Sequence, residues 1–221
     1  MRSTWPLPPP REPRRTPWQP DPRPPAPLPI TPSQASILDT SQDWLTERLL
    51  DQRMVTLAGK LDSTAANRAA ASLALLDASG DDLVELRLCD VDADLDIALT
   101  LLDTLDLMGV AVHATCLGKL TGAAVAILAV ADHRTAGPHA TLHLCEPRTQ
   151  RSGHARDVAT HAENHQRRLR LLQERIAAAC RRSVDAVATD MRAGRILTAE
   201  EAHGYGLIDA TAAKGSRQPS A

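Results

Sequence analysis

Apolar and polar positions alternate along the chain from about residue 44 in a way that predicts short strands separated by helices. Apolar runs of four to six residues indicate strands, and apolar positions recurring every three to four residues indicate amphipathic helices. The expected strands cover 53–57, 83–88, 110–114 and 140–145. The expected helices cover 44–50, 63–76, 95–108, 121–131, 155–180, 183–191 and 199–204. This order is typical of an α/β domain with a mostly parallel sheet joined by right-handed crossovers.

Three of these helices carry additional signals. The helix over 121–131 is nearly uncharged and rich in Ala, so we expect it to be buried on most sides. The helix over 155–180 is the longest and is polar over much of its first half. Thr198 and Glu201 have the spacing of a capping box at the start of the last helix.

The distribution of proline sets the limits of the folded part. Thirteen of the 16 prolines fall within residues 1–32, among five arginines and two acidic residues. Proline lacks a backbone donor, and this stretch has too few large aliphatic residues to offset the entropy of ordering it. The sequence therefore predicts a disordered tail over 1–35, a single folded domain over 36–211 and a disordered tail over 212–221.

Composition and charge exclude several classes of function. The chain has 221 residues, a net charge of −2, 2% aromatic residues and no Phe. No apolar run reaches the ~20 residues of a membrane-spanning helix, and no apolar segment follows the basic N-terminus. We therefore expect a cytoplasmic protein that does not bind a membrane. With the basic tail set aside, the folded part is acidic, which argues against nucleic-acid binding.

The potential ligands for metals and cofactors are sparse. The four cysteines stand singly without a CxxC pair, so neither a disulfide framework nor a zinc ribbon is indicated. His161 and His165 have helical i, i+4 spacing with His154 nearby, but their neighbours are charged and read as a solvated helix face. No Gly-rich phosphate loop of standard spacing is present. We therefore expect neither a metal nor a cofactor.

Several short segments, taken in order, resemble one known family. They begin with Leu49-Leu50 and Val55-Thr56-Leu57-Ala58-Gly59 and continue with Leu101-Leu102-Asp103-Thr104, Cys116-Leu117-Gly118-Lys119, Leu197-Thr198-Ala199-Glu200-Glu201-Ala202 and Tyr205-Gly206-Leu207-Ile208-Asp209. Together they resemble the proteolytic subunit of the ATP-dependent Clp protease. The resemblance implies a crotonase-like α/β fold with flanking helices and a long protruding helix.

The family resemblance also implies where a serine, a histidine and an aspartate would stand. Family members use such a triad, with backbone amides at a Gly-Gly pair stabilising the oxyanion. Here the serine position, counted from Gly118, is Gly122. The histidine position, counted back from Pro147, is Cys145, and the aspartate position is Gly194. By this resemblance we expect no intact catalytic residue.

The Gly-Gly pair falls at about Asp92 and Ala93, in what we expect to be an acidic loop from residue 90 to 94. Carboxylates there would oppose the negative charge of the transition state. The same loop argues against an acyl-CoA enzyme of the crotonase type, which needs the same kind of donor pair.

Displaced residues offer a weaker route to catalysis. Thr121 precedes the serine position by one residue, and His143 precedes the histidine position by two. The competing interpretation makes Thr121 a helix cap and His143 a partly buried strand residue. A Cys145–His143 thiol pair is a further possibility, against which Cys145 simply fills volume.

Two functional hypotheses from different classes follow from the resemblance. The first is a non-catalytic subunit or regulator of a ring-shaped ATP-dependent peptidase, forming homo- or hetero-oligomeric rings with Clp proteolytic subunits. The helix over 155–180 is the candidate contact. The second is a residual serine-type endopeptidase that uses the displaced residues. A decaying gene product is a third option. Family rings grip an unfoldase with a groove usually lined by aromatic residues, so the scarcity of aromatic residues argues against strong unfoldase docking.

Overall fold

The computed structural model describes residues 44–147 and 155–212, with side chains described from residue 161 onward in the second range. The predicted tail over 1–35 and nearly all of the tail over 212–221 lie outside the described residues. Within them, no helix is long and apolar enough to cross a membrane.

The described strands form one mixed sheet of seven strands. Its main path runs β1-β2-β3-β4-β7, all parallel, and β5 pairs with the later part of β3. Only β6 runs antiparallel, along β5. The strands are β1 Met54–Leu61, β2 Val84–Ala93, β3 Val112–Gly122, β4 His133–Ala136, β5 Thr141–Leu144, β6 Arg195–Thr198 and β7 Ala210–Thr211. The predicted fold class, an α/β domain with a mostly parallel sheet and flanking helices, is confirmed.

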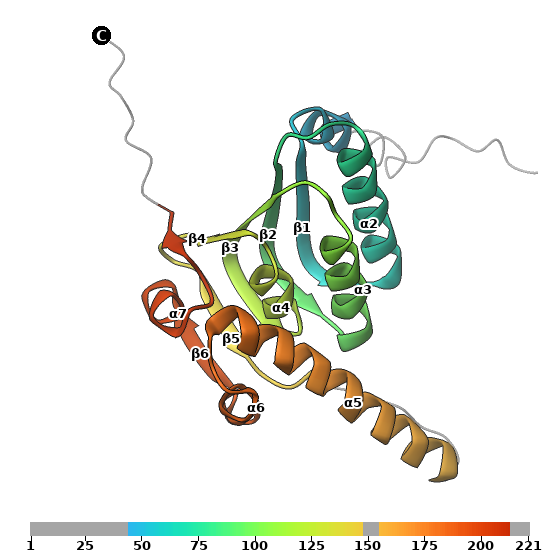
Figure 1. Cartoon of the computed structure of the whole chain (residues 1–221), viewed down its shortest axis with the longest axis vertical. Coiled ribbons are helices and arrows are strands. Elements are labelled where there is room, and N and C mark those ends of the chain that lie inside the picture. The colour runs from blue at the N-terminus through green and yellow to red at the C-terminus, as the bar shows by residue number, and fades with distance from the viewer. Residues whose placement is uncertain (1–43, 148–154, 213–221) are drawn as a thin grey trace, which may run out of the picture. The chain divides into compact units, whose positions relative to one another are not determined.

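The helices pack mainly on one face of this sheet. Figure 1 shows α2 and α3 side by side beside β1 and β2, with α4 next to α3. A short helix over 44–51 precedes β1. The others are α2 Ser63–Ala78, α3 Leu95–Asp106, α4 Ala124–Ala129, α5 Ala155–Cys180, α6 Val184–Ala193 and α7 Ala199–Tyr205. The predicted capping box of α7 is present, because Thr198 and Glu201 bind each other's backbone amides.

Because side chains alternate along the strands, the sheet has one buried apolar face and one partly exposed polar face. Leu86 and Leu88 of β2 are fully buried beneath the helices, while Glu85 and Arg87 on the opposite face are partly exposed and form an ion pair of 2.9 Å. Burial of each such leucine contributes about 1.5–3 kcal/mol. The core between the sheet and the helices is built mainly from Leu, Val, Ile and Ala. These residues form a buried core although the chain has no Phe.

The junction between β3 and α4 differs from the prediction of a helix over 121–131. β3 continues to Gly122, and α4 begins only at Ala124. Residues 119–121 pair with β5, and this ladder of backbone hydrogen bonds outweighs the local helix preference of the Ala-rich sequence. The expectation that Thr121 caps the helix is therefore wrong, since the residue before α4 is Ala123 and no side chain caps it.

Three strands have no counterpart in the predicted elements: β4, β6 and β7. Each is four residues or shorter, and β4 reads His-Arg-Thr-Ala with no apolar run. They are strands because distant neighbours supply their hydrogen bonds, a signal that local sequence does not carry.

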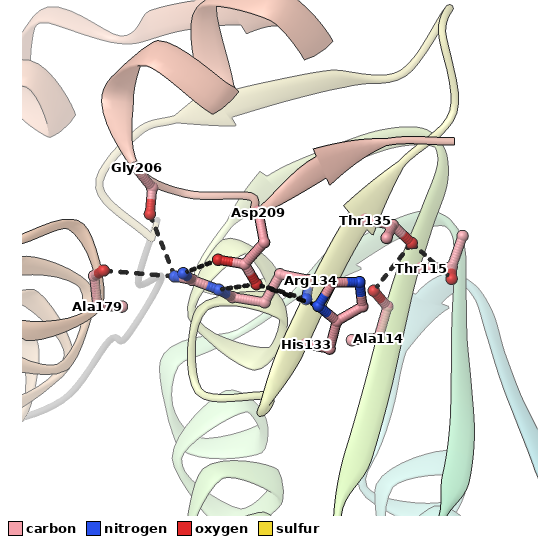
Figure 2. Close-up of polar contacts among 8 residues, drawn as sticks. All are labelled: Ala114, Thr115, His133, Arg134, Thr135, Ala179, Gly206 and Asp209. Atoms are coloured by element: carbon pink, nitrogen blue, oxygen red, sulfur yellow. Dashed lines mark hydrogen bonds and ion pairs between the residues drawn. The ribbon is translucent and has the colours of Figure 1, made fainter. Parts of the chain in front are cut away.

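An arginine from β4 anchors the last strand (Figure 2). Asp209 accepts hydrogen bonds from the backbone amide of Arg134 at 2.8 Å and from its Nε at 3.1 Å. The same guanidinium donates to the carbonyl of Gly206 at 3.1 Å, at the end of α7. Arg134 of β4 thereby binds both the end of α7, at Gly206, and the residue before β7, Asp209.

The second half of the long helix α5 packs against the rest of the chain. Leu172 and Ile176 are completely buried, whereas Leu171 is 51% exposed. Arg168 pairs with Asp96 of α3 at 2.7 Å, and Arg175 pairs with Asp106 at the other end of the same helix. Residues 161–164, in the first half of α5, are exposed. Figure 1 shows this first half of the helix running away from the sheet.

Candidate functional site

The turn from β3 into α4 brings Gly122 against Cys145. Gly122 has a left-handed φ of +61°, which ends the strand and turns the chain into the helix. A Cβ at this position would lie 3.7 Å from both the Sγ and the carbonyl oxygen of Cys145. The structure therefore brings together the residues predicted to stand for the serine and the histidine.

Gly194 occupies a second left-handed turn. It is the C-cap of α6, with φ of +67° and ψ of 47°, and it leads directly into β6. Among the described residues outside its chain neighbours, a Cβ at Gly194 would come within 4 Å of one heavy atom, Nε2 of His143, at 3.6 Å. The position predicted for the aspartate thus adjoins His143, whereas Gly122 adjoins Cys145.

His143 is partly buried in β5, as predicted, and lies beside Thr121 of β3 in register. Its Nδ1 is buried and has no hydrogen-bond partner among the described residues. The pairing places the two displaced candidates on neighbouring strands. It does not produce the hydrogen bond that would let Nδ1 of His143 activate the Thr121 hydroxyl.

The end of β2 lies on the other side of Thr121. Asp92 pairs with Thr121 in register and Ala93 pairs with Gly122. The prediction of an acidic loop over 90–94 is wrong for residues 90–93, which belong to β2. Parallel pairing with both β1 and β3 extends this strand through the aspartates.

An irregularity interrupts the ladder at Asp90. The register between β2 and β3 shifts between Cys89 and Val91, and Asp90 has a left-handed φ of +52°. The Asp90 carboxylate accepts a hydrogen bond of 2.8 Å from the backbone amide of Lys119. The carboxylate thereby satisfies a donor that the irregularity removes from the ladder.

A buried tyrosine holds the turn at Gly194 in place. Tyr205 is 3% exposed and donates a 2.7 Å hydrogen bond to Asp190, which also pairs with Arg195 at 3.4 Å. The guanidinium of Arg182 stacks 4.0 Å above the tyrosine ring. Burial and the hydrogen bond to Asp190 raise the pKa of Tyr205. This network was not predicted; Tyr205 was noted only as part of a family motif.

The side chains at this site limit what it can do chemically. Gly122 offers no nucleophile. The Cys145 thiol lies beside it, and Thr121, the residue before it, is in register with His143 of β5. No group of three or more His, Cys, Asp or Glu residues able to hold a metal occurs in the described part of the chain. His154 lies outside that part.

Comparison with known proteins identifies the family. The model of the Clp protease family matches residues 39–215, which is most of the chain. The chain therefore belongs to the Clp protease family.

Individual relatives agree with this assignment. The chain is similar to ATP-dependent Clp protease proteolytic subunit 3 of Rhodococcus jostii, with 31% identity over 76% of this chain and 85% of the relative. It is also similar to proteolytic subunit 1 of Corynebacterium diphtheriae and of Thermobifida fusca. Both are 28% identical over 73% of this chain, covering 79% and 75% of the relatives, respectively.

Proposed function

We propose that this chain is a non-catalytic subunit or regulator of a cytoplasmic, ring-shaped, ATP-dependent peptidase. The observation that carries the proposal is Gly122. It stands at the turn from β3 into α4, where the family resemblance places the nucleophile, and it has no side chain to attack a carbonyl. Cys145 beside it and Gly194 beyond it stand where the base and its orienting carboxylate are expected.

The electrostatics at the end of β2 support the same conclusion. Asp92 is exposed and stands with Ala93 at the positions expected for the oxyanion donors. A carboxylate near a developing oxyanion raises the barrier instead of lowering it. Because triad members act as a unit, the loss of all of them leaves little for one neighbouring group to rescue.

Assembly with other subunits is part of the proposal. The relatives are named as proteolytic subunits of an ATP-dependent protease. A subunit without its own chemistry acts by completing a ring with active copies. We expect weak docking of an unfoldase, since the chain has no Phe and its one Tyr is buried.

Co-expression with an active Clp proteolytic subunit tests the proposal. We expect native mass spectrometry to show mixed rings, and a fluorophosphonate probe to label only the active subunit. Leu171→Asp on the exposed side of α5 should weaken assembly, and Leu107→Asp, at an 84% exposed site after α3, serves as the matched control. A chain that stays monomeric with every active subunit of its own cell would contradict the proposal.

A residual serine-type endopeptidase is the second candidate function, favoured by the register pairing of Thr121 with His143. Turnover of a fluorogenic peptide that disappears in Thr121→Ala and persists in Thr100→Ala would establish it. Thr100 is an exposed residue of α3 and controls for loss of a hydroxyl elsewhere. Absence of turnover and of fluorophosphonate labelling eliminates this candidate.

A further inference from the structure

Two histidines lie side by side on the polar face of the sheet. His113 of β3 and His133 of β4 are in register, and their ring centroids are 5.1 Å apart. His113 is also in register with Glu85 of β2, so the three residues form one row across neighbouring strands and share a face. The side chain of His133 is 47% exposed and His113 is partly exposed. Solvent and dissolved ions therefore reach this pair of imidazoles.

The separation of the rings suits two imidazoles that bind one metal ion. A tetrahedral ion holds each ligand nitrogen at about 2.0–2.1 Å, which places two such nitrogens about 3.3 Å apart. Because each nitrogen lies at the edge of its ring, the ring centroids then stand about 5 Å apart, close to the distance observed here. Two aromatic rings in simple contact also stand this far apart. The groups around the pair distinguish the two interpretations.

A carboxylate directs the proton on His133. Nδ1 of His133 lies 3.8 Å from Oδ2 of Asp209, a contact drawn in Figure 2. A carboxylate that faces one ring nitrogen favours the tautomer with the proton on that nitrogen. Nε2 then carries the free lone pair, and a carboxylate behind the other nitrogen is the usual arrangement of a metal-binding histidine. His133 is thus prepared for a ligand in a way that simple ring contact does not require.

The charges around the histidine pair do not repel a cation. The two nearest carboxylates are those of Asp209, which precedes the neighbouring strand β7, and of Glu85 in the same row. Arg134 pairs with Asp209, and Arg87 pairs with Glu85 at 2.9 Å. Each arginine is therefore offset by a carboxylate, and the row carries no uncompensated positive charge.

We propose that His113 and His133 together bind one divalent transition-metal ion on the polar face of the sheet. Imidazole ligands suit Ni²⁺, Cu²⁺ and Zn²⁺. No group of three or more potential metal ligands occurs among the described residues, so water completes the coordination shell. The sequence gave no sign of this site, because the two histidines meet only through the pairing of β3 with β4. The site is independent of the positions that stand for the catalytic triad.

Titration of the untagged full-length protein with NiCl₂ tests the proposal. Ni²⁺ is the probe because imidazole suits it, whereas thiolates select Zn²⁺ and Cu⁺. His161→Gln and His165→Gln are introduced first, since these residues form a second histidine pair at helical spacing on α5. In this background, isothermal titration calorimetry should still show saturable binding of Ni²⁺. Absence of saturable binding overturns the proposal.

Single variants in the same background assign the ligands. His113→Gln and His133→Gln should each weaken Ni²⁺ binding at least about tenfold, because the second imidazole acts at a high effective concentration once the first has bound. His203→Gln, which removes an exposed histidine of α7, is the matched control and should leave the affinity unchanged. Circular dichroism verifies that each variant is folded. An unchanged affinity in folded His113→Gln or His133→Gln overturns the proposal.

A second measurement leaves the histidine pair intact. The chain has 8 histidines, so protein labelled with 15N-histidine gives few ring signals, which the single variants assign. Paramagnetic Ni²⁺ broadens the signals of nuclei close to it. At substoichiometric Ni²⁺, the ring signals of His113 and His133 should broaden together and before that of His203. Broadening that begins at other histidines, or at only one of the pair, overturns the proposal.

Discussion

The carboxylate of Asp90 occupies the space directly over the α-carbon of Gly118. A Cβ at Gly118 would overlap all three atoms of that carboxylate group, and the φ of Gly118 is +81°. The carboxylate is held there by its hydrogen bond from the amide of Lys119. Gly118 is therefore required on two grounds, backbone conformation and side-chain space.

We predict that Gly118→Ala lowers the free energy of unfolding by about 2–3 kcal/mol, the sum of left-handed strain and displacement of Asp90. Gly59→Ala is the matched control, because Gly59 has a φ of +70° but no atom of the described residues within 4 Å of its Cβ point. It should cost only about 1 kcal/mol. Urea denaturation measures both, and equal losses would show that Asp90 moves aside without cost.

The pairing of Arg134 with Asp209 should be among the more stabilising of the described ion pairs. Arg134 is only 14% exposed, so Asp209→Asn leaves a mostly buried guanidinium with carbonyl partners alone. We expect a loss of about 1–2 kcal/mol. Asp185→Asn is the control, since Asp185 is 88% exposed in its pair with Arg170, and it should cost less than about 0.5 kcal/mol.

The same pair predicts a specific dependence on acidity. Hydrogen bonds from Arg134 hold the pKa of Asp209 below its ordinary value of 3.8. A carboxyl whose pKa is lowered by folding adds stability above its unfolded pKa, and that stability is lost as the pH falls through the folded pKa. The stability difference between wild type and Asp209→Asn should therefore be constant from pH 7 to about 5 and shrink below about 4. A difference that persists unchanged at pH 3 would contradict this assignment.

Tyr205 can be followed alone because it is the only tyrosine in the chain. Burial and the Asp190 hydrogen bond raise the pKa of its phenol, so no phenolate absorbance should appear near pH 10 while the protein is folded. In denaturant the same group should ionise near its ordinary value. Since the unfolded chain releases this proton first, stability should fall as the pH rises above about 10. Phenolate absorbance near pH 10 with the fold intact would contradict the buried hydrogen bond.

The sequence was informative where structure is local. The Thr198–Glu201 capping box, the long α5, the first halves of β1 and β2 and the start of β3 were all predicted, because each depends on residues a few positions apart. β4, β6 and β7 were not predicted, because their pairing partners lie far away in the sequence.

The same difference between local and long-range signals decides which parts of the candidate site could be predicted. Short motifs located Gly122 and Cys145, which the structure brings into contact distance. The sequence could not predict that His143 lies beside Gly194. His143 belongs to β5 and Gly194 to the end of α6, and nothing in the local sequence around either residue indicates this contact. The strand character of Asp92 and Thr121 likewise arises from pairing across β1, β2, β3 and β5.

Restoring the three substituted positions tests their assignment. We predict that the triple variant Gly122→Ser, Cys145→His and Gly194→Asp reacts with a fluorophosphonate probe, while the wild type does not. The left-handed φ of both glycines should cost about 1–2 kcal/mol for each residue, so the folded fraction is checked by circular dichroism. The three double variants, each with one position left as in the wild type, should remain nearly unlabelled because triad members act as a unit. Labelling of a double variant equal to that of the triple, or labelling abolished by adding Thr121→Ala, would assign the chemistry to other residues.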